Sequence, residues 1–223
     1  RRAVCDRVDE LAEVLIQTSR AIHANPELAF QEHAAHDLLT GVLAAEGIDV
    51  VQSAYGMETA FEGSAGTTGP VVAVLCEYDA LPGIGHACGH NIIATAGLGA
   101  GLAAAAVAEE LGGRIRILGT PAEEGGGGKV ELINAGAFED AAASMMVHPG
   151  PFDELDPSFQ ACQHFEVEFF GKESHAAFAP ELGINTLDAF VQATRRLQRV
   201  AGKIMYGEPC SSVPVRRRPQ GAP

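Results

Sequence analysis

The chain has 223 residues, enough for one large domain or for one domain and part of another. Its 29 acidic residues outnumber its 15 basic residues and give a formal net charge of −14, which argues against nucleic acid or an anionic membrane as a partner. We see no uninterrupted apolar stretch long enough to span a membrane and no signal-peptide pattern, and five scattered cysteines suit a reducing compartment, so we expect a soluble cytoplasmic protein.

Hydrophobic spacing predicts alternating helices and strands over the first 150 residues. The predicted helices are Asp6–His23, Glu32–Glu46, the Ala-rich Ile92–Leu111 and Val130–Asn134. The predicted strands are Ile48–Val51, Thr59–Glu62, the apolar run Val71–Cys76, Arg114–Leu118 and Ala142–Val147. Such alternation predicts an α/β fold, a sheet with helices on its faces.

The alternation breaks at the acidic, proline-containing segment Pro151–Pro157. Beyond it, residue spacing predicts a strand at His164–Phe170 and a helix at Asn185–Val200. We therefore predict a first domain over residues 1–160 and the beginning of a second over 161–201. The tail, residues 202–223, repeats proline without hydrophobic periodicity, and we expect it to be disordered.

Candidate metal ligands follow three of the predicted strands. Cys88 and His90 lie two residues apart in a loop after Val71–Cys76, and a thiolate and an imidazole at that spacing can reach one metal or two adjacent metals. This pair alone is a weak signal, because buried cysteines and hydrogen-bonded histidines are common. Open α/β sheets bind ligands at the carboxyl ends of their strands, where this loop falls.

The adjacent carboxylates Glu123 and Glu124 follow the next strand, and His148 follows the one after it. One carboxylate can bind a cation while its neighbour accepts a proton from the attacking water. A lone Glu-Glu pair is more often a solvated acidic turn. Candidate ligands after three successive strands make coincidence the weaker explanation.

The run Gly125–Lys129 invites comparison with a phosphate-binding loop. That pattern requires Ser or Thr after the lysine and a glycine where Glu123 stands, whereas Val130 follows Lys129. Two carboxylates beside the loop would also repel a triphosphate. Nucleotide hydrolysis is therefore not favoured.

Five motifs occur in the order of a known family: His23–Leu28, Asp79–Pro82, His86–His90, Pro121–Gly125 and Gly171–Ala177. Together they resemble the zinc-dependent amidohydrolase and peptidase family of the aminoacylases, carboxypeptidase G, hippurate hydrolase and plant auxin-conjugate hydrolases. The fuller strings resemble most the branch of Xaa-Arg (β-alanyl-lysine) dipeptidase and p-aminobenzoyl-glutamate hydrolase. The resemblance spans about residues 10–200.

The resemblance implies a three-layer α/β catalytic domain, followed by a smaller α+β domain for dimerisation or lid closure. It implies a hydrolase with two metal ions, zinc by preference and manganese or cobalt as alternatives, that acts on dipeptides or N-acyl amino acids. Glu123 is then the general base. The metal ligands are Cys88, His90, Glu124 and His148.

Further roles follow from the resemblance alone. Asp79 matches an aspartate that orients the metal site from outside the ligand set. Glu77 stands near a position where other branches carry a metal-binding histidine, a ligand that Cys88 and His90 then replace. His175 matches a histidine that stabilises the oxyanion in the partner subunit of a homodimer. The remaining histidines are expected to be surface side chains, although His23 and His86 lie inside the motifs and are candidates for indirect support of the site.

The sequence also departs from the family pattern. Family members continue beyond this length, complete the large sheet and supply one more metal-binding histidine, so we expect a C-terminally truncated member with an incomplete catalytic domain. Two alternatives therefore stay open. One is an inactive fragment, and the other is an amidohydrolase for aromatic acyl conjugates of amino acids.

Overall fold

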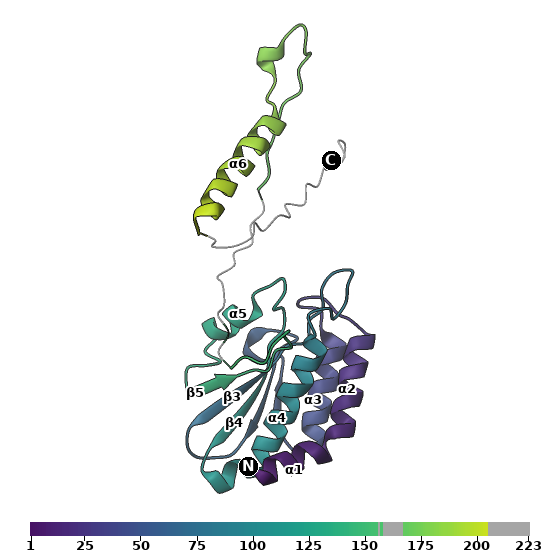
Figure 1. Ribbon diagram of the computed structural model, residues 1–223, viewed down its shortest axis with the longest axis vertical. Helices are drawn as coiled ribbons and strands as arrows, with labels where there is room; N and C mark the ends of the chain where they lie inside the picture. Colours follow the sequence, from purple (N-terminus) through teal and green to yellow (C-terminus); the bar gives the residue numbers. More distant parts are fainter. Residues whose placement is uncertain (156, 158–166, 205–223) are drawn as a thin grey trace. The chain divides into compact units, whose positions relative to one another are not determined.

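The computed structural model describes residues 1–155, 157 and 167–204, and the chain divides into two compact units (Figure 1). The first unit is Arg1–Leu155 and the second is Asp156–Pro223. The boundary that we predicted at residue 160 and most of the predicted tail, from residue 205 onward, lie outside the described residues.

The first unit is built on a five-stranded mixed sheet with the strand order β1-β2-β4-β3-β5. Its strands are β1 (Asp49–Gln52), β2 (Phe61–Ala65), β3 (Val71–Cys76), β4 (Arg114–Gly119) and β5 (Ala141–Met145). The interior strand β3 is parallel to both β4 and β5, whereas β2 pairs antiparallel with β4 and β1 pairs antiparallel with β2. Parallel strands end at the same edge, so the segments after β3, β4 and β5 meet there.

Four helices cover one face of this sheet (Figure 1): α1 (Arg2–Glu10), α2 (Ala12–Ala24), α3 (His33–Ala45) and α4 (His90–Leu111). We expected a single helix over Asp6–His23, but the chain turns at Leu11, which is 2% exposed and belongs to the core. Burial of Leu11 places α1 and α2 separately against α4. The packing of these helices thus overrides a helical spacing that runs through both.

The two faces of the sheet have separate cores, because alternate residues of a strand point to opposite faces. Ile117 and Cys76 belong to the core under the four helices, with Leu39 and Leu98. Leu118 points to the other face. There a smaller core is closed by α5 (Gly128–Asn134) and the segment before β2. The predicted α/β class is confirmed, with a large helical layer on one face and a small one on the other.

By length and composition, one helix of the described residues could cross a membrane, α4. We expected no such stretch. However, 61% of its most apolar window is buried inside the first unit, where α4 packs on β3 and β4. These contacts are those of a core helix.

The described part of the second unit contains the turn η2 (Pro180–Leu182) and the helix α6 (Thr186–Ile204). Lys172 and Ile184 form an isolated antiparallel bridge before this helix. The helix matches the one predicted at Asn185–Val200. The strand predicted at His164–Phe170 lies partly outside the described residues, and its described part, residues 167–170, has no regular structure.

Candidate metal centre

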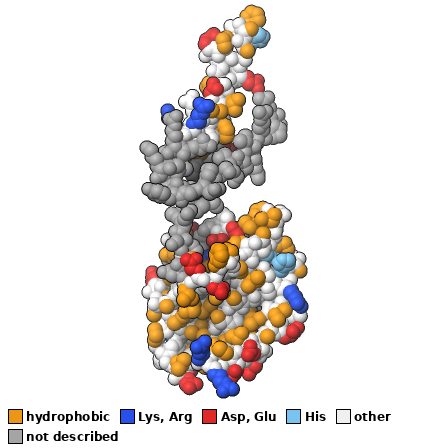
Figure 2. All heavy atoms as spheres, in the orientation of Figure 1, with side chains coloured by type: hydrophobic (Ala, Val, Ile, Leu, Met, Phe, Trp, Pro, Cys, Tyr) orange, Lys and Arg blue, Asp and Glu red, His pale blue; other side chains and the backbone are white. Residues whose placement is uncertain are grey.

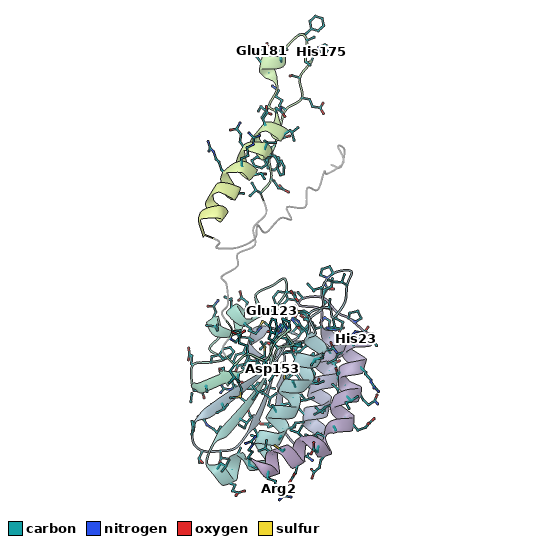
Figure 3. The ribbon with its side chains drawn as sticks, in the orientation of Figure 1. Arg2, His23, Glu123, Asp153, His175 and Glu181 are labelled. Carbon is teal, nitrogen blue, oxygen red and sulfur yellow. The ribbon has the colours of Figure 1, made fainter. Side chains whose placement is uncertain are left out.

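The candidate ligands meet where β3, β4 and β5 end, and Figure 3 shows Glu123 at this edge of the first unit. Glu77 and Asp79 directly follow β3, Glu123 and Glu124 follow β4, and His148 follows β5. His90 begins α4. Three strand ends and one helix start thus supply the side chains; the three strand ends were predicted from the sequence, whereas His90 was expected in the loop before the helix.

His90 is the fixed centre of the cluster, with a side chain that is completely buried. Its Nδ1 lies 2.9 Å from Asp79 Oδ1, and Asp79 Oδ2 accepts a hydrogen bond of 2.9 Å from the backbone N–H of Glu124. Burial raises the pKa of Asp79, but the bonds from His90 and Glu124 outweigh it and lower the pKa overall. Asp79 therefore joins the end of β4 to the start of α4 through one ionised carboxylate.

The other ring nitrogen of His90 faces three carboxylates. His90 Nε2 lies 3.4 Å from Glu77 Oε2 and 3.7 Å from oxygens of both Glu123 and Glu124. Burial lowers the pKa of His90, but the neighbouring carboxylates, Asp79 foremost, reverse this and raise it. Because Nδ1 faces Asp79, a neutral imidazole would turn its lone pair at Nε2 toward the other carboxylates. Such an arrangement is favourable only with a positive charge at that point, a proton or a metal cation.

Cys88 and His148 form the exposed side of the cluster. Cys88 Sγ lies 3.6 Å from His148 Nε2, while His148 Nδ1 lies 2.7 Å from the carbonyl oxygen of Pro149. That carbonyl fixes the proton on Nδ1 and leaves Nε2 free to bind a metal. Gly89, between the two residues of the Cys-x-His motif, has a φ of +84°, and a Cβ there would lie 3.0 Å from Pro149 Cγ. Glycine thus lets the loop turn tightly against the His148 segment.

Glu123 and Glu124 differ in exposure, with side chains that are 41% and 21% exposed. Burial, together with the negative charge of Glu77, raises the pKa of Glu123. A carboxylate with a raised pKa and partial access to solvent suits a general base. The less exposed Glu124 suits a ligand.

The donor set fits a divalent metal ion. Ligand atoms of Cys88, His90 and His148 all lie within 4.8 Å of one another, and so do those of Glu77, His90 and Glu123. Within the described part of the chain, three atoms of this cluster are buried without a hydrogen-bond partner: His90 Nε2, Glu77 Oε2 and Glu124 Oε1. Buried polar atoms normally have partners, so three such atoms around one point fit the binding of a cation.

The thiol of Cys88 agrees with this interpretation. Burial and the neighbouring Glu124 carboxylate raise the pKa of Cys88 to about 12, so the sulfur keeps its proton in this acidic surrounding. A metal ion replaces such a proton when a thiolate ligand forms. The mixed donors, sulfur, imidazole and carboxylate, are those that zinc accepts.

The sequence that carries this site matches a known protein family. The model of peptidase family M20/M25/M40 matches residues 71–221, which is more than half of the chain. The chain belongs to this family. The M20 match includes every candidate ligand and extends past residue 200, where the resemblance of the motifs ends.

Two relatives refine the M20 assignment. Xaa-Arg dipeptidase of Mus musculus is 44% identical over 211 residues, covering 88% of this chain and 49% of that protein. A p-aminobenzoyl-glutamate hydrolase polypeptide from Escherichia coli K12 is 32% identical over 213 residues, covering 86% of this chain and 44% of that protein. The resemblance to this branch is therefore confirmed. The chain spans about half the length of the curated relatives it matches.

A solved M20 structure supports the metal interpretation. A Bacillus subtilis protein, described as a dinuclear metal binding peptidase from the M20 family, matches with a TM-score of 0.56 and 27% identity. The match covers 61% of this chain and 42% of that protein. Family membership and the ligand geometry of this chain together support a metal cofactor.

The structure brings together Cys88, His90, Glu123, Glu124 and His148, which we predicted from the sequence. His175 belongs to the second unit, where its Nδ1 accepts a hydrogen bond of 3.2 Å from the N–H of Ala177 and its ring packs edge-on against Phe178. The role suggested for His175 stays a prediction.

Several residues around the cluster were missed. Glu77, which we left out of the ligand set, is 1% exposed and is paired with Lys129, the lysine of the glycine-rich loop. His36, whose ring packs against Phe61, was expected on the surface but is only 5% exposed. His86 was expected either on the surface or as indirect support of the site, and it is 8% exposed. For the pair of Glu77 and Lys129, the available signal was the run of glycines before Lys129, which permits a tight turn toward the end of β3.

Proposed function

We propose that this chain carries the metal centre of a metal-dependent hydrolase of dipeptidase type, acting on amide bonds in dipeptides or N-acyl amino acids. The observation that carries the proposal is the meeting of a sulfur, two imidazoles and several carboxylates at one edge of the sheet, with unpartnered atoms facing each other. The M20 match and the Xaa-Arg dipeptidase relative support the reaction class.

Cys88, His90, Glu124 and His148 would hold the metal, and Zn²⁺ is the proposed ion because a thiolate favours it over manganese. Two zinc ions per site follow from the family resemblance. When bound, the metal would polarise the scissile carbonyl and lower the pKa of water, so that the nucleophile becomes available at neutral pH. Glu123 accepts the proton from the attacking water and passes it to the leaving nitrogen. Asp79 holds the His90 ring in the orientation that leaves Nε2 facing the cluster.

The remaining parts of the proposal concern the whole protein. His175 would stabilise the oxyanion in a partner subunit, which requires a homodimer. We also propose that the protein is cytoplasmic. In the described part of the chain, Cys5, Cys76 and Cys88 are free thiols, which suits a reducing compartment.

A second candidate is an amidohydrolase for aromatic acyl conjugates of amino acids. It is favoured by the Escherichia coli relative that is named for p-aminobenzoyl-glutamate hydrolase. A substrate panel separates the two candidates: faster release of amino acid from dipeptides ending in Lys or Arg supports the dipeptidase, and faster cleavage of benzoyl-amino acids supports the amidohydrolase.

The proposal is tested by elemental analysis of the purified chain and by turnover of the substrate panel. We expect bound metal, and we expect Glu123→Gln to keep that metal while turnover falls about 10²–10⁴-fold. Glu131→Gln is the control, because Glu131 lies exposed on α5 and should leave both unchanged. Full turnover of Glu123→Gln with metal bound would contradict the general-base role, and absence of metal from the unsubstituted chain would contradict the metal site.

A further inference from the structure

Glu32 is a completely buried carboxylate outside the ligand cluster, and no step of the proposed reaction uses it. It directly precedes α3 and lies four residues after the motif His23–Leu28. Buried carboxylates are rare unless they are paired or strongly hydrogen-bonded. The partners of Glu32 therefore indicate why it is there.

Both carboxylate oxygens of Glu32 accept hydrogen bonds from segments that lead to the cluster. Oε1 accepts a bond of 2.9 Å from the backbone N–H of Ala122, the residue before Glu123. Oε2 accepts a bond of 2.9 Å from the hydroxyl of Thr59. The carbonyl of Thr59 in turn accepts a 2.5 Å bond from the hydroxyl of Tyr78, which stands between Glu77 and Asp79. One buried chain of bonds thus connects the ends of β3 and β4 through Glu32.

The bond to Ala122 acts on an unusual backbone conformation. Ala122 has a φ of +58°, a left-handed conformation that residues with a side chain rarely adopt. This conformation turns the chain at the end of β4, where Glu123 and Glu124 begin. Strained residues of this kind persist only where the surroundings hold them. A carboxylate bound to the N–H of Ala122 is such a constraint.

The surrounding segment supports the same turn. Phe30 packs so closely that a Cβ on Gly126 would lie 2.3 Å from its ring, and the carbonyl of Ala122 accepts hydrogen bonds from the N–H groups of Gly126 and Gly128. On the β3 side, the carbonyl of Glu27 accepts a 2.8 Å bond from the N–H of Ala80, next to Asp79. Residues 27–32 therefore contact the loops of both strand ends.

We propose that Glu32 is a positioning residue, which holds Ala122 in its left-handed turn and thereby aims Glu123 and Glu124 at the metal site. This inference rests on the proposed function in naming the metal as the target. Every bond described above lies within the protein, so the role of Glu32 in the turn can be tested separately from metal binding.

The first test measures hydrogen exchange of the Ala122 amide by NMR in the unsubstituted chain and in Glu32→Gln and Glu32→Ala. We expect slow exchange in the unsubstituted chain and exchange at least about 10-fold faster in Glu32→Ala. Glu32→Gln should lie between them, since its amide oxygen can still accept the Ala122 bond. It preserves the side-chain volume, so it also carries the test if Glu32→Ala does not fold. Exchange in the unsubstituted chain as fast as at exposed amides would overturn the proposal, whatever the metal does.

The second test titrates the same proteins with Co²⁺ and follows its visible absorption, which reports on the ligands around the metal. We expect Glu32→Ala to bind Co²⁺ about 10–100-fold more weakly, in the range seen when residues that support metal ligands are lost. Adding Ala122→Gly to Glu32→Ala should recover part of the affinity, because glycine adopts a positive φ without strain. Unchanged affinity and spectrum in folded Glu32→Ala would refute the positioning role.

The control is Glu27→Gln. The Glu27 carboxylate accepts bonds from the N–H groups of Ala34 and Ala35 at the start of α3, on the helix side of this segment. We expect it to leave Ala122 exchange and Co²⁺ affinity unchanged. If the unsubstituted chain binds no Co²⁺, the proposed function fails, while the exchange experiment still decides whether Glu32 holds the turn.

Discussion

The inner and outer halves of the candidate metal centre are built in different ways. The inner half consists of Glu77, Asp79 and His90, with side chains that are 0–2% exposed. The outer half consists of Cys88, Glu123 and His148, which are partly or largely exposed. The inner side chains come from the end of a central strand and the first turn of a helix, and the outer ones come from loops.

This difference has an energetic consequence. Buried charges are tolerated only with partners, and each charge of the inner half has one: Asp79 pairs with His90, and Glu77 pairs with Lys129 of α5. Loss of an inner residue leaves a partner unpaired in the core, whereas loss of an outer residue leaves groups that water can solvate. The inner half should therefore affect both folding and metal binding, whereas the outer ligands Cys88 and His148 should affect metal binding alone.

Replacing His90 tests this contrast with the largest expected effect. His90→Ala removes a proposed ligand, and it leaves Asp79 and Glu77 as buried carboxylates with one partner fewer. We expect metal affinity to fall by at least about 100-fold and the free energy of unfolding to fall by about 3 kcal/mol. Urea denaturation and Co²⁺ titration measure the two effects. An unchanged free energy of unfolding would contradict the proposed contribution of the inner half to folding.

Replacing His148 should separate the two effects. Its side chain is exposed, so His148→Ala should change the free energy of unfolding by no more than about 0.5 kcal/mol while Co²⁺ affinity falls about 10-fold. His33→Ala is a matched control, because His33 is an exposed histidine on α3 outside the cluster. A large loss of stability in His148→Ala would contradict the prediction that only the inner half contributes to folding.

The same contrast explains how far the sequence predicts the fold. Strand β3 was predicted to the residue, because a strand buried on both faces leaves a continuous apolar run. Strand β4 was predicted to within one residue, although Arg114 and Arg116 alternate with its isoleucines. The break between α1 and α2 was missed, since Leu11 continues the helical spacing and only its packing on the core reveals the turn. Strand β2 begins at Phe61 rather than Thr59, whose hydroxyl instead binds Glu32.

The candidate ligands were predictable because each lies in the segment after β3, β4 or β5, and these parallel strands end at one edge of the sheet. Glu32 was not predictable in this way. It lies 90 residues before its partner Ala122, and nothing in the spacing of the sequence relates the two. Nor does sequence reveal a positive φ at an alanine, a conformation that pattern-based reasoning assigns to glycine.

The exposed apolar surface of the second unit contrasts with the packed first unit. Figure 2 shows hydrophobic side chains along its described part, and Phe170, Phe178 and Leu187 are 83%, 87% and 62% exposed. In the first unit, by comparison, Phe61, Leu39 and Leu98 are completely buried. The candidate metal centre thus belongs to the unit with the packed core, Arg1–Leu155.

The smallest expected effect concerns the pH dependence that Glu32 brings to the first unit. Burial raises the pKa of Glu32, and the hydrogen bonds from Thr59 and Ala122 only partly offset this. The folded state then binds the Glu32 proton more tightly than the unfolded state, so the free energy of unfolding decreases as pH rises from the ordinary glutamate pKa to the raised one. Burial and the charge of Glu32 raise the pKa of Tyr78 well above its ordinary value, so Tyr78 stays neutral over this range.

Glu32→Gln cannot titrate, so its stability relative to the unsubstituted chain should increase over this pH interval and be constant above it. Urea denaturation of both proteins from the ordinary glutamate pKa up to neutral pH measures the difference, and metal-free buffer keeps ligand binding out of the comparison. The opposite slope would mean that the two hydrogen bonds outweigh burial and that Glu32 stabilises the fold as an ion. With the expected slope, Glu32 lowers stability at neutral pH while fixing the Ala122 turn. Its carboxylate would then be explained by the placement of Glu123 and Glu124 rather than by the stability of the core.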